Sequence, residues 1–148
     1  MIKVFGIGNP LLGDDAIALH LLKQLAGNPL LMPYMSFFQA ETDCFYALEE
    51  IEPDDFIIIL DSCHFENTLG TVFYMPLDTF PSLPSLSAHS FNLLNELRIY
   101  FPQIQGFFIG IEIHEIKPSL ILSPPLNELL PEIHLEVASF LHALIHNP

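Results

Sequence analysis

Hydrophobic residues along the chain follow two patterns that alternate with each other. Continuous apolar runs rich in β-branched and aromatic residues predict five strands, one ending at Phe5 and the others at 35–40, 56–60, 70–75 and 106–113. Apolar positions that repeat every three or four residues predict helices after Asp15, at 47–51, at 89–100 and from Pro124 onward. Pro131 is expected to break or restart the last helix, because proline removes a backbone donor and crowds the preceding turn.

Strands that alternate with helices predict an α/β fold. We expect a single domain over residues 1–148, a three-layer sandwich whose mainly parallel, twisted sheet of about five strands carries helices on both faces. The run at 56–60 is apolar throughout, so we expect a central strand covered on both sides. The direction of the strand at 70–75 stays open, and the Pro- and Ser-rich segment 76–87 is expected to be a long irregular connection.

Charge narrows the range of partners. The chain has 4 basic and 18 acidic residues and a formal charge of −14, so we expect no binding to a nucleic-acid phosphate backbone. Acidic charge serves solubility, and it would also suit a partner with a basic tail. The first residues lack a signal-peptide pattern, and the apolar run 56–60 is far too short for a membrane span. We therefore expect a cytoplasmic protein without membrane insertion, with Cys44 and Cys63 as reduced thiols.

Candidate chemistry begins in the glycine-rich segment 6–15, which joins the first strand to the first helix. Its glycines permit a tight turn, Asp14 is a good N-cap residue, and Asp15 adds negative charge where the helix dipole favours it. The glycine spacing differs from the dinucleotide fingerprint, the segment lacks the P-loop lysine, and acid at a helix start repels phosphate. A cation is the expected ligand, although helix capping alone also explains both aspartates.

Two further residues are expected at the same edge of the sheet. Asp61 ends the central strand, and His89 begins the helix that follows the long connection. Because the first and third strands should be neighbours, their carboxyl ends bring Asp15 and Asp61 together, with His89 completing the cluster. Two carboxylates and one imidazole form an open ligand set that suits nickel or zinc. Each residue also has a structural explanation of its own, as a strand end, a helix-dipole charge or an exposed helix start.

These residues stand in motifs that resemble those of the hydrogenase maturation endopeptidases. The resemblance covers nearly the whole chain in element order, and its blocks are the segment 6–15, the strand ending at Asp61 with 69–72, and the segments 87–91, 109–112 and 122–125. In proteins similar to this one, the residues that match Asp15, Asp61 and His89 contact the metal. Two positions depart from the pattern: 40–44 lacks the usual glycine pair, and Ser62 stands where an alanine usually follows the aspartate.

The resemblance implies an endopeptidase that removes the C-terminal extension of a nickel-iron hydrogenase large-subunit precursor after nickel insertion. It implies that Asp15, Asp61 and His89 are both the metal ligands and the catalytic residues. The precursor would supply the nickel, so we expect no tightly bound metal in the isolated protein. Whether nickel polarises the scissile carbonyl, activates a water or serves only recognition stays open, as does acid–base work by the aspartates, as in an aspartyl protease.

Three alternatives account for parts of the sequence. A phosphoacceptor receiver domain also has an early acidic pair, an aspartate after its third strand, a hydroxyl residue (here Ser87) and a lysine before proline (here Lys117), although it lacks an inserted glycine loop. A non-catalytic maturation factor would bind the metal or the precursor without cutting. A cysteine hydrolase using Cys63 and His64 is disfavoured, because adjacent side chains on an extended segment point to opposite faces.

Overall fold

A computed structural model describes residues 1–78 and 87–147 of this chain. The elements, in chain order, are β1 (Ile2–Ile7), the short 3-10 helix η1 (Gly13–Ala16), α1 (Ile17–Ala26), β2 (Met35–Glu41), α2 (Cys44–Glu49), β3 (Phe56–Cys63), β4 (Val72–Pro76), α3 (Ala88–Tyr100), β5 (Gln105–Glu112) and α4 (Pro124–His146). The strands form one sheet in the order β2-β1-β3-β5-β4. Of the long connection expected at 76–87, residues 79–86 lie outside the described residues.

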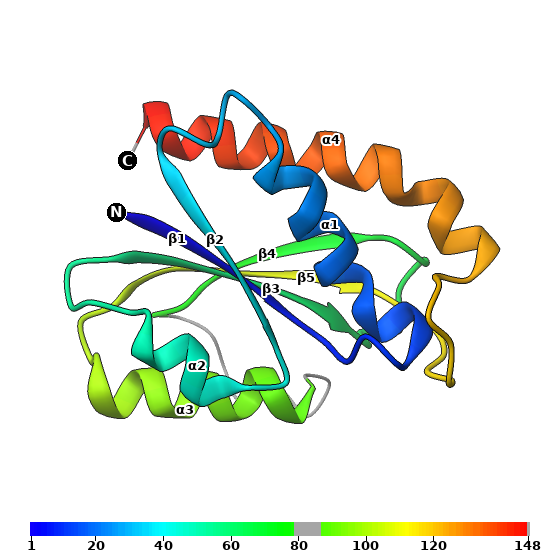
Figure 1. The fold of residues 1–148 in the computed structure, drawn as a ribbon, viewed down its shortest axis with the longest axis horizontal. Helices are drawn as coiled ribbons and strands as arrows, with labels where there is room; N and C mark the ends of the chain where they lie inside the picture. The colour runs from blue at the N-terminus through cyan, green and yellow to red at the C-terminus, as the bar shows by residue number, and fades with distance from the viewer. Residues whose placement is uncertain (79–86, 148) are drawn as a thin grey trace.

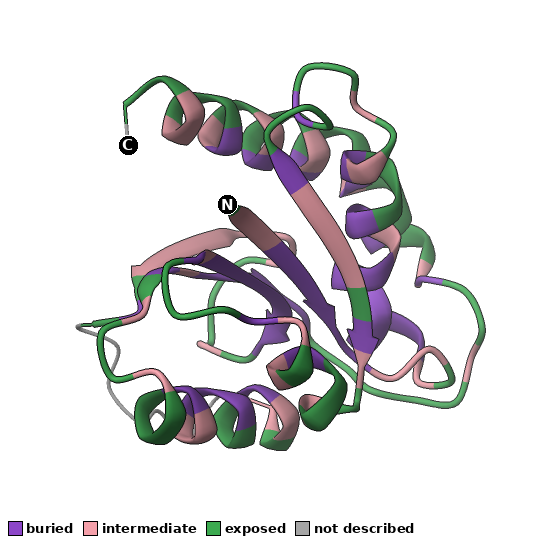
Figure 2. Cartoon of the chain, turned by 60° about the vertical axis from the view of Figure 1, so that its left-hand side comes forward, coloured by how far each residue is buried: buried purple, intermediate pink, exposed green. Residues whose placement is uncertain are grey.

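Helices cover both faces of the sheet (Figure 1). Helices α1 and α4 pack over one face, where Ile58 and Leu60 of β3 are buried, and α2 and α3 pack over the other, where Ile57 and Ile59 are buried. Successive side chains of a strand point to opposite faces, so β3 contributes to both cores. Figure 2 shows this burial along the central strands. The predicted α/β three-layer sandwich is confirmed, with β3 at its centre.

The sheet is parallel except at one edge. β4 pairs with β5 in the antiparallel direction, whereas the β1–β2, β1–β3 and β3–β5 pairs are parallel. This arrangement resolves the direction of the strand expected at 70–75. It also differs from the parallel 2-1-3-4-5 order of receiver domains, which argues against that alternative. In the described part of the chain, no helix has the length and apolarity to cross a membrane.

Two predicted element boundaries are wrong. The third strand does not stop at Asp61, because β5 continues to pair with it until Cys63 lies opposite Glu112. Pro131 neither breaks nor restarts the last helix, since α4 is continuous around it. The proline ring is on the exposed side of the helix, while Leu130 and Ile133 are buried on either side of it. Packing of the apolar face therefore outweighs the local helix-breaking tendency of proline.

Candidate functional site

The loop between β1 and η1 turns back tightly at two glycines. Gly8 has a φ of +146° and Gly13 a φ of +58°, both in the region that glycine adopts without strain. A side chain at Gly8 would also collide with the backbone oxygen of Asp15. The close approach that only glycine allows thus sets the position of η1 next to the end of β1.

Asp14 does not cap the first helix as predicted. It lies inside η1, whose N-cap residue Leu12 makes no side-chain capping bond, and α1 begins only at Ile17. The Asp14 carboxylate instead accepts hydrogen bonds from the backbone N–H and the hydroxyl of Ser123, both at 2.7 Å. Asp14 therefore ties η1 to the residue that precedes α4, a tertiary contact that local capping preferences cannot predict.

Asp15 and Asp61 are brought together at the carboxyl edge of the sheet. The hydroxyl of Ser62 donates to Asp15 Oδ1 at 3.0 Å, and the backbone N–H of Ser62 donates to Asp61 Oδ1 at 2.8 Å. The second oxygen of Asp15 accepts from the backbone N–H of Asn9 at 2.9 Å. Both aspartates are buried, so the predicted pairing of a carboxylate from η1 with one from β3 is present in the structure.

Serines of the first turn of α3 complete the surroundings of Asp61. The hydroxyls of Ser87 and Ser90 donate to Asp61 Oδ2 at 2.5 and 2.6 Å. Burial raises the pKa of Asp61 to about 7, because loss of water penalises its ionised form more than the hydrogen bonds of Ser87, Ser90 and Ser62 favour it. The charge of Asp15 raises this pKa further. Asp61 therefore changes its protonation state near neutral pH.

His89 lies on the same turn of α3 as Ser87 and Ser90. It is half-buried, and within residues 1–78 and 87–147 it forms no hydrogen bond or ion pair with either aspartate. Among these residues, no three His, Cys, Asp or Glu side chains are close enough together to hold one metal ion. The structure thus pairs Asp15 with Asp61 and leaves His89 beside the pair.

The donor types nevertheless fit a divalent first-row metal. Carboxylate oxygen and imidazole nitrogen suit nickel and zinc, and Asp15 and Asp61 already lie close together. Asp61 is fully buried and its hydrogen bonds come from neutral donors, so no cationic side chain within residues 1–78 and 87–147 neutralises it.

The sequence did not reveal the roles of three serines. Ser62 was recognised only as a departure from the family pattern and Ser90 only as part of a motif, while Ser87 was also considered as the hydroxyl residue of a receiver domain. Ser87 is the N-cap of α3 and accepts a hydrogen bond from the backbone of Ser90 at 3.1 Å. For Ser87 and Ser90, the signal that could have identified them is a pair of hydroxyl residues three apart at a helix start. Such side chains lie on the same face of the helix and can therefore donate to one acceptor.

Cys63 is unsuited to nucleophilic catalysis. Burial, followed by the nearby charge of Glu112, raises the pKa of the Cys63 thiol well above its usual range. His64, the partner considered for it, is exposed, whereas Cys63 is fully buried. The structure therefore supports the prediction that Cys63 is a packed thiol.

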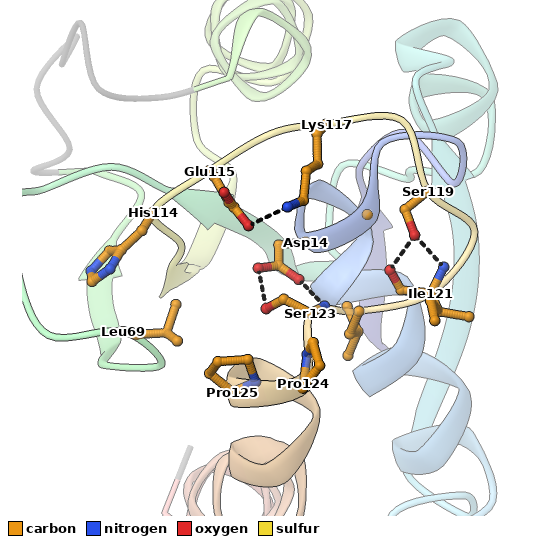
Figure 3. A pocket seen from close by; sticks show the side chains of 12 residues that line it. Asp14, Leu69, His114, Glu115, Lys117, Ser119, Ile121, Ser123, Pro124 and Pro125 are labelled. Atoms are coloured by element: carbon orange, nitrogen blue, oxygen red, sulfur yellow. Dashed lines mark hydrogen bonds and ion pairs between the residues drawn. The ribbon is translucent and has the colours of Figure 1, made fainter.

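A cavity of about 400 Å³ lies beside Asp14, between η1, the start of α4 and the loop that follows β5 (Figure 3). Its apolar wall includes Leu69, Leu122 and Pro125. Its polar groups are paired within the protein: Asp14 accepts from Ser123, and Lys117 forms an ion pair with Glu115 at 3.0 Å (Figure 3). The cavity therefore adjoins the paired carboxylates through Asp14, which precedes Asp15 in η1.

Comparison with solved structures finds the same fold in hydrogenase maturation proteins. The hydrogenase maturating endopeptidase HybD from E. coli is 22% identical, with a TM-score of 0.75 over 96% of this chain and 92% of its own. The NiFe hydrogenase maturation protease HybD from Thermococcus kodakarensis is 20% identical, with a TM-score of 0.75 over 95% of this chain and 98% of its own. An endopeptidase from Escherichia coli is 23% identical, with a TM-score of 0.77 over 92% and 88%.

Protein-family models and curated protein sequences give no significant match. The structural likeness nevertheless extends over almost the full length of both chains in each comparison. It includes the sheet and the helices on both of its faces, the features expected from the sequence resemblance. This chain has the fold of the hydrogenase maturation endopeptidases.

Proposed function

We propose that this chain is an endopeptidase that removes the C-terminal extension of a nickel-iron hydrogenase large-subunit precursor after nickel insertion. One observation carries the proposal: two buried carboxylates, Asp15 and Asp61, meet through Ser62 at the carboxyl edge of a sheet with the fold described above. Ligand sites of open α/β sheets lie beyond the carboxyl ends of the strands. The fold and this placement support a reaction at that edge.

Nickel enters this proposal as part of the substrate. Asp15, Asp61 and His89 would recognise the nickel held by the precursor, and the scissile bond would lie next to it. Asp61 gives up its hydrogen bonds to Ser87 and Ser90 when it binds the ion, which makes binding of free metal costly. We therefore expect modest affinity for free nickel and cleavage of the nickel-loaded precursor in preference to the nickel-free one.

Asp61 also supplies a proton-exchanging group at the site. A carboxyl with a pKa of about 7 is divided between its acid and base forms at neutral pH, the condition that suits general acid–base work. Bound nickel would supply Lewis-acid chemistry toward the scissile carbonyl or a water. The chain's own residues orient the precursor, and Asp61 gives up its proton when it becomes a ligand of the nickel.

Cleavage is tested with a purified large-subunit precursor, prepared with and without nickel, and with chelator-stripped protein. We expect the wild type to release a C-terminal peptide, detected by mass spectrometry, from the nickel-loaded precursor only. Asp61→Asn should abolish this release, while Asp54→Asn, at an exposed position, should retain it. Wild-type cleavage by Asp61→Asn would contradict the proposed role, and equal cutting of both precursors would show that nickel is not the recognition signal.

A non-catalytic maturation factor is the second candidate. The observation in its favour is that Asp61 is fully buried and accepts hydrogen bonds from three serines. Such a protein would form a complex with the nickel-loaded precursor without shortening it. Size-exclusion chromatography of the same mixture, read beside the mass spectrum, separates the two functions.

A further inference from the structure

Ser62 forms the only side-chain hydrogen bond between Asp15 and the central strand in the described part of the chain. Its hydroxyl donates to Asp15 Oδ1, although the two residues are 47 positions apart, and its backbone N–H donates to Asp61 Oδ1. The remaining bond of Asp15 comes from Asn9, which belongs to the same loop. Without the Ser62 hydroxyl, the Asp15 carboxylate would keep only the hydrogen bond from its own loop and none to β3.

The hydrogen bond from Ser62 to Asp15 is shielded from water by burial. Ser62 is 2% exposed, Asp15 6% and Asp61 0%, so water competes little for the hydroxyl. A neutral donor between two acidic side chains satisfies their oxygens without neutralising their charge, which a lysine or arginine would do. The oxygen that each carboxylate uses for its bond from Ser62, Oδ1 in both residues, keeps a further lone pair for another partner. The Ser62 contact thus holds the two carboxylates at a fixed separation and leaves them able to bind a cation.

We propose that Ser62 is a positioning residue that sets Asp15 in register with Asp61 for binding the nickel of the precursor, an inference that rests on the proposed function. The hydroxyl is the group that acts. The resemblance noted from the sequence implies an alanine at this position, which keeps the backbone donor but has no side-chain donor. Replacing a residue that holds a metal ligand in place typically lowers the metal affinity by about 10- to 100-fold.

The first test measures binding of Ni²⁺ alone to tag-free, chelator-stripped protein by calorimetry. His142 and His146 are one helical turn apart, with ring centroids separated by 4.4 Å, and such a pair can bind Ni²⁺ by itself. Both are therefore replaced by alanine in every protein compared. Asp61→Asn in this background defines the heat that does not come from the carboxylate site.

Three serine variants isolate the hydroxyl. We expect Ser62→Ala to raise the Kd for Ni²⁺ about tenfold, and Ser62→Thr, which keeps a hydroxyl, to stay within about twofold of the parent. Ser139→Ala serves as the matched control, because Ser139 is exposed on α4 and donates only to Leu135. Thermal melts of all variants check that each is folded at the temperature of the titration.

The second test compares KM and kcat for the nickel-loaded precursor. Positioning of a recognition ligand predicts that Ser62→Ala raises KM about tenfold with little change in kcat, and that Ser62→Thr restores KM. The inference is overturned if Ser62→Ala keeps the parent Kd and KM, if Ser62→Thr fails as badly as Ser62→Ala, or if the parent shows no Ni²⁺ binding that Asp61→Asn removes. Absence of cleavage by the parent, in contrast, would defeat the proposed endopeptidase function.

Discussion

At the scale of single residues, serine hydroxyls are the main partners of the acidic side chains at the carboxyl edge of the sheet. Three buried aspartates each accept a hydrogen bond from a serine side chain: Asp14 from Ser123, Asp15 from Ser62, and Asp61 from Ser87 and Ser90. A buried polar group is costly unless it is hydrogen-bonded, and these donors meet that need without adding positive charge. The edge consequently keeps the negative charge that a cation requires.

This arrangement predicts that Asp61 lowers stability as the pH rises. Its pKa is about 7 in the folded protein against an ordinary value of 3.8, so the folded state binds the proton more tightly than the unfolded chain. The cost of ionising Asp61 is absent below about pH 4, develops between about pH 4 and 7, and is constant above that range. The difference between the two pKa values corresponds to about 4 kcal/mol.

The measurement is urea unfolding of the wild type and of Asp61→Asn between pH 4 and 8. At pH 4 the two proteins should have similar free energies of unfolding, and by pH 8 the variant should be more stable by up to about 4 kcal/mol. Other titrating groups contribute equally to both proteins and cancel in the difference. A difference that stays constant over this range would contradict the raised pKa of Asp61.

At the scale of secondary-structure elements, Glu112 joins the end of β5 to the loop that leaves β3. Its buried carboxylate accepts from the backbone N–H of Phe65 at 2.8 Å and from that of Asn67 at 3.0 Å. Hydrogen bonds to a charged group contribute more than neutral ones, and the loop has its backbone donors fixed in this way. Glu112 therefore holds the loop that begins three residues after Asp61.

Replacing Glu112 should destabilise the domain through this loop. We expect Glu112→Ala to lower the free energy of unfolding by about 3 kcal/mol, because two backbone donors lose a charged acceptor. Glu112→Gln should cost less, since Oε1 alone lies within hydrogen-bond reach of both Phe65 and Asn67. Urea unfolding at pH 7 gives both values, and equal losses in the two variants would show that the acceptor oxygen is not what matters.

Helix α4 carries a proline that tertiary packing tolerates, so removing it should stabilise the protein. Pro131→Ala restores a backbone donor for the carbonyl of Asn127 at an exposed position inside the helix. We expect the free energy of unfolding to rise by about 1 to 3 kcal/mol. Loss of the proline, which restricts the unfolded chain of the wild type, offsets part of this gain. Glu132→Ala, at the next exposed position, is the control and should change stability little. A lower melting temperature for Pro131→Ala would contradict this account.

At the scale of the whole molecule, the sequence predicts the layers well and the contacts between them poorly. Continuous apolar runs such as 56–60 identify central strands, because a strand covered on both faces has no polar side. The pairing of Asp15 with Asp61 follows from neighbouring parallel strands. The Asp14–Ser123 contact and the continuity of α4 at Pro131 depend on which distant segments meet, and no local pattern contains that information.

The same limit applies to the candidate site. Sequence motifs identify carboxylates and an imidazole, but hydrogen-bond partners such as Ser62 are decided by separations of a few tenths of an ångström in the folded chain. His89 stays a prediction of the motif, since it lies at the start of α3 and, among the described residues, forms no hydrogen bond or ion pair with either aspartate. The sequence thus predicts which residue types gather at the site, whereas the hydrogen bonds that these residues form depend on the tertiary structure.

The charge of the whole molecule leads to the last prediction. With 18 acidic and 4 basic residues, the folded chain places like charges close together, and this repulsion opposes the compact state. Salt screens exposed charges, whereas the partly buried pair of Lys3 and Asp55, at 2.6 Å, is screened less. The melting temperature at pH 8 should therefore rise with NaCl from 10 to 200 mM by about 3 °C, equivalent to about 1 kcal/mol in a domain of this size.

A charge-reversed variant separates repulsion from other effects of salt. Glu128→Lys combined with Glu132→Lys changes two exposed positions of α4 and lowers the net negative charge without touching the core. Because less repulsion remains to be screened, its melting temperature should start higher at 10 mM NaCl and rise less toward 200 mM. Differential scanning calorimetry of both proteins at matched concentration gives the comparison. If the melting temperatures of the two proteins rise in parallel with NaCl, the stabilisation comes from general salt effects on apolar burial. If the melting temperature of the wild type falls with NaCl, attractive ion pairs outweigh the repulsion among its acidic residues.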